Sequence, residues 1–166
     1  ACFLDCRIKS IVIPSTIKEL GHAAFCGNEM ESVTMPSTLS DGRTSIKFST
    51  MVFAGNPMET FYFPDWLTVI PSSFLMNCGK LRSVRFAPNT TDIQAFAFQN
   101  AYMLSVGGSL PETVTHIGEE AFARGGLGLP YDQFFINKLE IGPDVQIDDK
   151  AFQYARIGAA TTISEI

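Results

Sequence analysis

Charged side chains are scarce in this chain. Only 17% of its 166 residues are charged, the formal net charge is −5 at pH 7, and lysine and arginine together number 12. A nucleic-acid partner is not expected, because the phosphate backbone demands clustered lysine and arginine. An acidic membrane surface is disfavoured for the same reason. No apolar run reaches the roughly 20 residues of a transmembrane helix, so we expect no membrane insertion within this segment.

Metal-binding and redox residues are equally few. The chain holds four cysteines, Cys2, Cys6, Cys26 and Cys78. No two are spaced as C-x-x-C, and the two histidines, His22 and His116, are far apart and expected on the surface, so no zinc pattern is present. We expect Cys6, Cys26 and Cys78 to be buried packing residues. A disulfide among the first three cysteines is the alternative, and it would favour an oxidising compartment.

Residues for catalysis form one weak group. Asp144, Asp148 and Asp149, with Glu140 nearby, could bind calcium or act as paired carboxylates. The simpler interpretation is that they solvate turns. A polysaccharide-cleaving β-helix would stack acidic and basic residues at equivalent positions, and the sequence does not suggest such stacking. We therefore expect no enzymatic activity and no metal or other cofactor.

Phenylalanine, in contrast, is abundant and regularly spaced. It recurs every 21 to 30 residues, at Phe3, Phe25, Phe53, Phe74, Phe98, Phe122 and Phe152. At four of these places the preceding residue is alanine. A signal with a period of 20 to 50 residues indicates repeats that each bury an apolar face against their neighbours. The chain is therefore predicted to be a solenoid, with the ring filling the space between coils.

A proline precedes each ring from the second onward, and a short apolar alternation precedes each proline. These pairs are Ile11 and Ile13, Val33 and Met35, Phe61 and Phe63, Val84 and Phe86, Leu104 and Val106, and Leu139 and Ile141. Alternation over so few residues predicts a short strand with one buried face. Proline has no N–H for a ladder and so ends the strand. A second apolar pair, such as Ile17 and Leu20, is expected to line the return path.

Asparagine is expected to support the turn after the ring. Asn28, Asn56 and Asn77 fall three residues past a phenylalanine, and Cys6 has the same place. A side chain there could hydrogen-bond the backbone of an adjoining turn.

The repeated unit resembles the BspA-like class of leucine-rich repeats. Residues 8–28 follow the pattern L-x-x-I-x-I-P-x-x-V-x-x-I-G-x-x-A-F, and residues 110–122 repeat its second half. The resemblance implies a surface-exposed or secreted microbial protein that binds host or neighbouring-cell proteins. It carries no catalytic set, because this family is similar in scaffold rather than in chemistry.

We predict one α/β-type solenoid domain over residues 1–166. It should be a right-handed, curved leucine-rich-repeat array of about six coils with a short parallel sheet on one face. The Ala-Phe residues should lie on the other face, in irregular or short helical segments. The ends carry no polar cap, so we expect an excerpt of a longer array.

The outward face of the sheet is the first candidate binding surface. Side chains alternate across a strand, which aligns two exposed columns over successive coils. One column is small and polar: Ser10, Ser32, Thr60, Ser83 and Lys138. The other is Val12, Thr34, Tyr62, Arg85 and Glu140, and tyrosine and arginine are enriched where partners bind tightly.

Two insertions, at residues 37–52 and 127–138, interrupt the repeat. The longer one gathers Tyr131, Phe134 and Phe135 and is the second candidate binding site, although these rings could equally fold onto the last coil. Trp66 could be an anchor for a partner or a lid over the return segment. The favoured function is non-catalytic recognition of an extracellular protein or glycan. The alternatives are a structural spacer and a carbohydrate-active β-helix.

Overall fold

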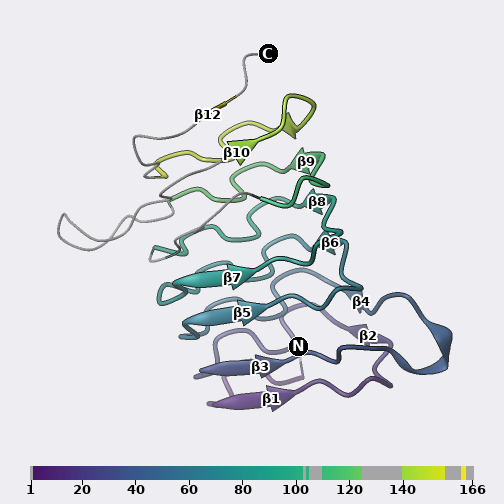
Figure 1. The fold of residues 1–166 in the computed structure, drawn as a ribbon. Coiled ribbons are helices and arrows are strands. Elements are labelled where there is room, and N and C mark those ends of the chain that lie inside the picture. Colours follow the sequence, from purple (N-terminus) through teal and green to yellow (C-terminus); the bar gives the residue numbers. More distant parts are fainter. Residues whose placement is uncertain (1, 103, 105–109, 125–139, 156–161, 164–166) are drawn as a thin grey trace.

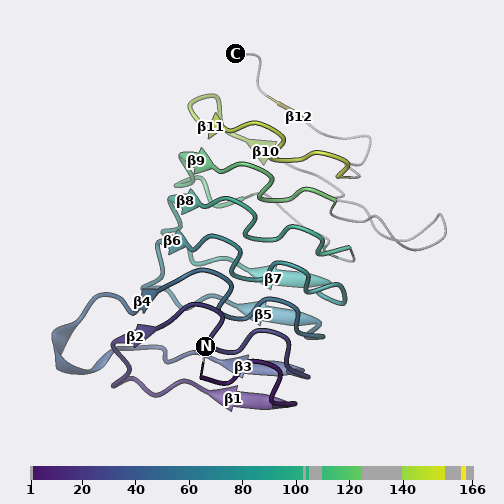
Figure 2. The ribbon, with the colours of Figure 1, turned by 180° about the vertical axis from the view of Figure 1, so that it is seen from behind.

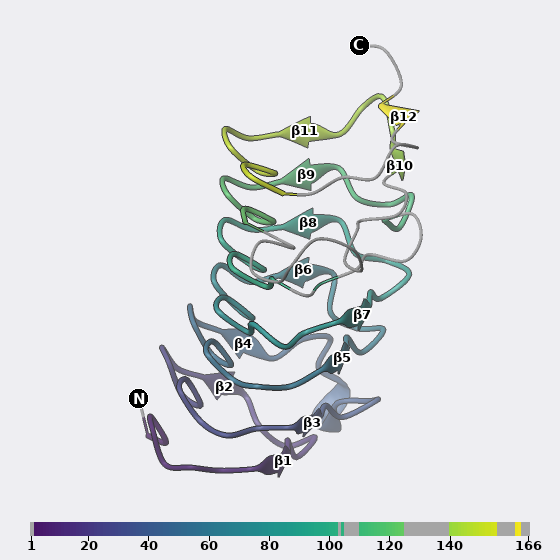
Figure 3. The same cartoon turned by 90° about the vertical axis from the view of Figure 1, so that its left-hand side faces the viewer.

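The computed structural model describes residues 2–102, 104, 110–124, 140–155 and 162–163, which form a stack of short coils (Figure 1; Figure 2). Strands lie at two corners of the coil, and Figure 3 shows the two corners as separate columns. The first-corner strands are β1 (Ser10–Val12), β3 (Ser32–Thr34), β5 (Thr60–Tyr62), β7 (Ser83–Arg85), β10 (Glu140–Ile141) and β12 (Thr162–Ile163). The second-corner strands are β2 (Glu19–Leu20), β4 (Lys47–Phe48), β6 (Val69–Ile70), β8 (Asp92–Ile93), β9 (His116–Ile117) and β11 (Gln146–Ile147).

Every strand pair in the described part of the chain is parallel. The first corner is divided into the sheets β1-β3, β5-β7 and β10-β12, and the second into β2-β4 and the four-stranded β6-β8-β9-β11. The strands expected before Pro14, Pro36, Pro64 and Pro88 are confirmed. The second corner was expected only as a return path and instead forms a ladder of its own. The longest ladder joins four coils; the total of about six coils and the right-handed sense stay predictions.

The Ala-Phe segments form tight turns, not helices. Residues two positions before the stacked ring have positive φ, for example 60° at Met51 and 50° at Glu120, and so do residues two positions after it, such as Arg124 at 56°. Left-handed residues on both sides prevent a helix from continuing. The one helix among the described residues is η1 (Ser40–Gly42), a 3₁₀ turn in the first insertion. The expected α/β type is therefore wrong, and the chain is a parallel β-solenoid whose turns are irregular.

The phenylalanine rings form the column that the spacing predicts. Neighbouring rings stack with centroids 5.3 Å apart for Phe3 and Phe25, and 5.7 Å apart for Phe25 and Phe53. The column resumes further on, where Phe122 stacks on Phe98 at 5.1 Å and on Phe152 at 5.3 Å. Burial of these rings between coils supplies much of the apolar core.

The predicted place of Phe74 in the phenylalanine column is wrong by one residue. The error falls in the coil that contains β5 and β6. The N–H of each stacked phenylalanine donates to the residue before the ring in the next coil: Phe25 to Val52, Phe98 to Ala121 and Phe122 to Ala151. Phe53, however, donates to Phe74, and Leu75 donates to Ala97. Leu75 therefore has the ring position, and Phe74 has the position usually held by alanine. This explains why Phe74 meets Phe53 edge-on, at 87°, rather than stacked.

Asparagine side chains three residues after the ring position hydrogen-bond the backbone of the turns. Asn56 is buried, its Nδ2 donates to the carbonyls of Phe25 and Phe53 at 2.9 Å, and its Oδ1 accepts the N–H of Met30 at 3.1 Å. Asn28 makes the matching bonds to the carbonyls of Phe3 and Phe25 at 2.6 and 3.0 Å. The expected role is thus confirmed for these two asparagines.

In the coil that contains β5 and β6, Cys78 rather than Asn77 has the position that asparagine has in the two preceding coils. It lies three residues after Leu75, and its Sγ lies 3.5 Å from the Phe53 carbonyl, which it contacts as a weak donor. Asn77 is exposed, so the prediction that it supports the turn is wrong. At the start of the stack Cys6 contributes its backbone N–H, which donates to Asn28 Oδ1 at 2.9 Å.

Candidate functional site

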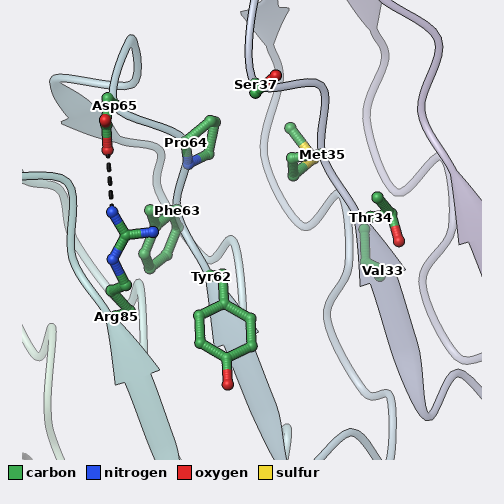
Figure 4. Close-up of a pocket in the computed structure, with 9 residues that line it drawn as sticks. All are labelled: Val33, Thr34, Met35, Ser37, Tyr62, Phe63, Pro64, Asp65 and Arg85. Atoms are coloured by element: carbon green, nitrogen blue, oxygen red, sulfur yellow. Dashed lines mark hydrogen bonds and ion pairs between the residues drawn. The ribbon is translucent and has the colours of Figure 1, made fainter.

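Three of the predicted partner-binding residues meet in one hollow on the first-corner face. The hollow has a volume of about 290 Å³ and is lined by Val33, Thr34, Met35, Ser37, Tyr62, Phe63, Pro64, Asp65 and Arg85 (Figure 4). The predicted residues among them are Thr34, Tyr62 and Arg85. In Figure 4 the Tyr62 ring lies between Arg85 on one side and Thr34 on the other.

The hollow lies where the first-corner ladder is interrupted. Strand β3 pairs with β1, and β5 pairs with β7, but β3 and β5 belong to different sheets although they are neighbours in the stack. Alternation over β5 and the residue after it turns Phe61 and Phe63 into the core and leaves Tyr62 outside, where 61% of it is exposed. The alternation in the sequence therefore predicts which of these three rings is exposed.

Arg85 and Asp65 form an ion pair at the edge of the hollow. Arg85 Nη2 donates to Asp65 Oδ1 at 3.2 Å, and both side chains are more than half exposed. An exposed pair of this kind contributes only about 0–1 kcal/mol to folding. Its chemical consequence is larger, because it places a guanidinium and a carboxylate side by side with most of their donors and acceptors open to solvent.

The other predicted binding residues are not brought to the hollow. Val12 pairs with Thr34 in the ladder and is 70% exposed, but does not line the hollow. Glu140 lies in β10 and pairs with Thr162, away from β7 in the stack. Tyr131, Phe134 and Phe135, the second candidate binding site, lie outside the described residues. Their role, and that of the whole predicted set, stays a prediction.

Trp66 packs within the fold, against the preceding coil. Its ring stacks on Phe48 with centroids 6.3 Å apart, and its Nε1–H donates to the Pro36 carbonyl at 2.8 Å. Both contacts reach the coil that carries the first insertion. The lid interpretation of this tryptophan is therefore the better one.

Sequence reasoning missed a carboxylate–histidine–carboxylate cluster on the second-corner ladder. His116 Nδ1 lies 2.7 Å from Asp92 Oδ1, and Nε2 lies 3.1 Å from Asp148 Oδ2. A neutral imidazole has only one N–H, so it donates to both carboxylates only when protonated. The hydrogen bond with Asp92, followed by that with Asp148, raises the pKa of His116 above its ordinary value. The positions 92 and 116 are paired in register, and that register is the signal that could have found the cluster.

This cluster corrects two expectations. His116 is partly buried rather than a plain surface residue, and acid does stack on base at equivalent positions, here and where Glu19 meets Lys47 at 3.3 Å. The hydrogen bond from Gln146, and then that from His116, lower the pKa of Asp148. Asp148 is thus engaged in holding coils together.

Within the residues that the structure describes, no three His, Cys, Asp or Glu side chains are grouped to hold a metal ion. The same residues contain no helix that is long and apolar enough to span a bilayer.

The cysteines match their prediction only in part. Cys78 is buried, as expected, and burial raises the pKa of its thiol to about 12, so it stays protonated and unreactive. Cys26 is half-buried, and burial raises its pKa as well. Cys6 is exposed, so the prediction of a buried residue is wrong there. All four thiols are free, so the alternative of a disulfide is not borne out.

Sequence comparison identifies the class to which this solenoid belongs. The family model of the BspA-type leucine-rich repeat region, in six copies, matches residues 1–127. The chain therefore belongs to the BspA-type leucine-rich repeat family. It is also similar to a solved structure, that of a leucine-rich repeat protein from Bacteroides ovatus ATCC 8483, with 20% sequence identity and a TM-score of 0.43. The match covers 92% of this chain and 54% of that protein. No curated protein matches the chain.

Proposed function

We propose that this chain is a non-catalytic recognition module that binds a protein or a glycan outside the cell through its first-corner face. The observation that carries the proposal is the hollow in which Thr34, Tyr62 and Arg85 meet. Tyrosine and arginine are the residue types that dominate binding energy at interfaces. Membership of the BspA-type family supports a repeat scaffold used for binding and, through that resemblance, a secreted or cell-surface location.

The charged cluster of His116 with Asp92 and Asp148 joins coils at the second corner, and none of its residues lines the hollow. The proposal therefore gives this cluster a structural role.

The test is a binding screen of the 166-residue chain with matched variants. Wild type, the double variant Tyr62→Ala/Arg85→Glu, and the control Tyr154→Ala are compared on a panel of extracellular-matrix proteins, cell-surface proteins and glycans. Tyr154 is 62% exposed, almost the same as Tyr62, but lies beside the phenylalanine column. We expect a saturable ligand whose binding the double variant weakens and the control does not, with melting temperatures of all three within a few degrees.

Binding that survives the double variant unchanged would exclude the hollow. If the wild type binds nothing on the panel, a structural spacer is favoured. Neither variant should then change any measured property of the chain.

A further inference from the structure

We propose that the hollow between β3 and β5 binds a neutral oligosaccharide. This inference rests on the proposed function and selects one ligand class for its site. It is drawn from three features of the first-corner face: the exposed hydroxyl groups along its strands, the compensated charge at the edge of the hollow, and the single exposed ring within the hollow.

The first feature is the density of hydroxyl groups. Ser10 pairs with Ser32 in the β1-β3 sheet, Thr60 pairs with Ser83 in the β5-β7 sheet, and all four side chains are exposed. Thr34 and Ser37 add two more in the hollow itself. Protein interfaces are depleted in serine, and serine and threonine are under-represented among hot-spot residues. A hydroxyl both donates and accepts, so this face matches a ligand that is itself rich in hydroxyl groups.

The second feature is charge. Among the nine residues that line the hollow, all of them described, Arg85 is the one cation and Asp65 the one anion, and they are paired at 3.2 Å. An acidic ligand would have to compete with Asp65 for the guanidinium and would meet its carboxylate. A neutral diol suits the pair as it stands, since one hydroxyl can accept from Arg85 while its neighbour donates to Asp65.

The third feature is the shape and composition of the floor. Val33, Met35, Phe63 and Pro64 are buried or half-buried beneath the polar rim, and the Tyr62 ring lies exposed at the centre. An apolar floor with a few placed polar groups is typical of small-ligand sites, which have volumes of about 300–1,000 Å³. A hollow of about 290 Å³ is therefore suited to a short segment of a saccharide chain, whose C–H faces can lie on the ring while its hydroxyls meet the rim.

The experiment uses an array of neutral gluco-, manno- and galacto-oligosaccharides, the same sugars bearing uronate or sulfate, and enzymatically deglycosylated extracellular-matrix proteins. Dissociation constants are then measured by titration calorimetry for wild type, Tyr62→Ala, Arg85→Lys and the control Tyr154→Ala. We expect binding to one or more neutral oligosaccharides. Tyr62→Ala should weaken it about tenfold or more, Arg85→Lys less, and Tyr154→Ala not at all.

Four results would overturn the inference, and one of them separates it from the proposed function. Preference for uronate or sulfate over the neutral sugar, or neutral binding that Tyr62→Ala leaves unchanged, removes the neutral-saccharide site. Binding to a deglycosylated protein that Tyr62→Ala weakens, without sugar binding, keeps recognition through the hollow and refutes the sugar. If no probe binds, both the neutral-saccharide site and the proposed recognition function are refuted.

Discussion

Replacement of Phe98 by alanine tests the whole architecture, because this ring joins three parts of the core. Phe98 is fully buried; it stacks on Phe122 at 5.1 Å and meets Phe86 and Phe63 edge-on at 5.9 and 6.2 Å. Removal of a buried phenylalanine side chain costs about 3–5 kcal/mol in transfer and cavity free energy. For a chain of this size that corresponds to a fall in melting temperature of roughly 6–20 °C.

The control is Phe3→Ala, which removes the same side chain from the end of the column. Phe3 is 47% exposed and has one ring partner, Phe25. About half of the 1.5–3 kcal/mol for full burial is at stake there, so we expect a loss of no more than about 1.5 kcal/mol. Urea denaturation followed by circular dichroism measures both free energies of unfolding. A loss below about 1 kcal/mol for Phe98→Ala, or equal losses for the two variants, would refute the packing of rings between coils.

Two further predictions concern polar groups. Asn56→Ala should lower the free energy of unfolding, measured by urea denaturation, by about 1–3 kcal/mol for each backbone group left unpaired. A loss no larger than that of an exposed substitution would contradict the role of Asn56 in supporting the turns. The second concerns pH: the raised pKa of His116, due first to Asp92, means that its stabilising contribution is complete below the ordinary histidine value of about 6.5 and is lost as pH rises through the higher folded value. The melting temperature of wild type should therefore fall more between pH 5.5 and 8.5 than that of His116→Gln, with His22→Gln as control. Parallel curves for wild type and His116→Gln would refute a stabilising role of the carboxylate–histidine–carboxylate cluster.

The first corner of the fold could be predicted because its signal is local. Ile11 with Ile13, and Phe61 with Phe63, alternate within three residues, and a proline follows directly. The second-corner strands are only two residues long, such as Val69–Ile70. Two residues cannot show an alternation, so hydrogen bonds between coils define this ladder and the sequence pattern does not.

The errors in the candidate residues have a common physical cause. Ser73-Phe74 imitates the Ala-Phe pair, and the register is decided by the backbone bond from Leu75 to Ala97, which no local pattern reveals. The contacts of His116 span 24 and 32 residues and exist only once the coils are stacked. Tyr62, in contrast, was predicted to be exposed because its neighbours on both sides are apolar.

The first insertion shows how the stack accommodates extra length in one coil. Arg43 fastens it to the preceding coil by donating from Nη1 and Nη2 to the carbonyls of Ile17 and Ser15, at 2.6 and 3.0 Å. The stacking of Phe25 on Phe53 and the bonds of Asn56 continue past it undisturbed. Each coil contacts only its neighbours, so added length at this corner is absorbed locally. The length of one coil can therefore differ without disturbing the buried column of rings on either side of it.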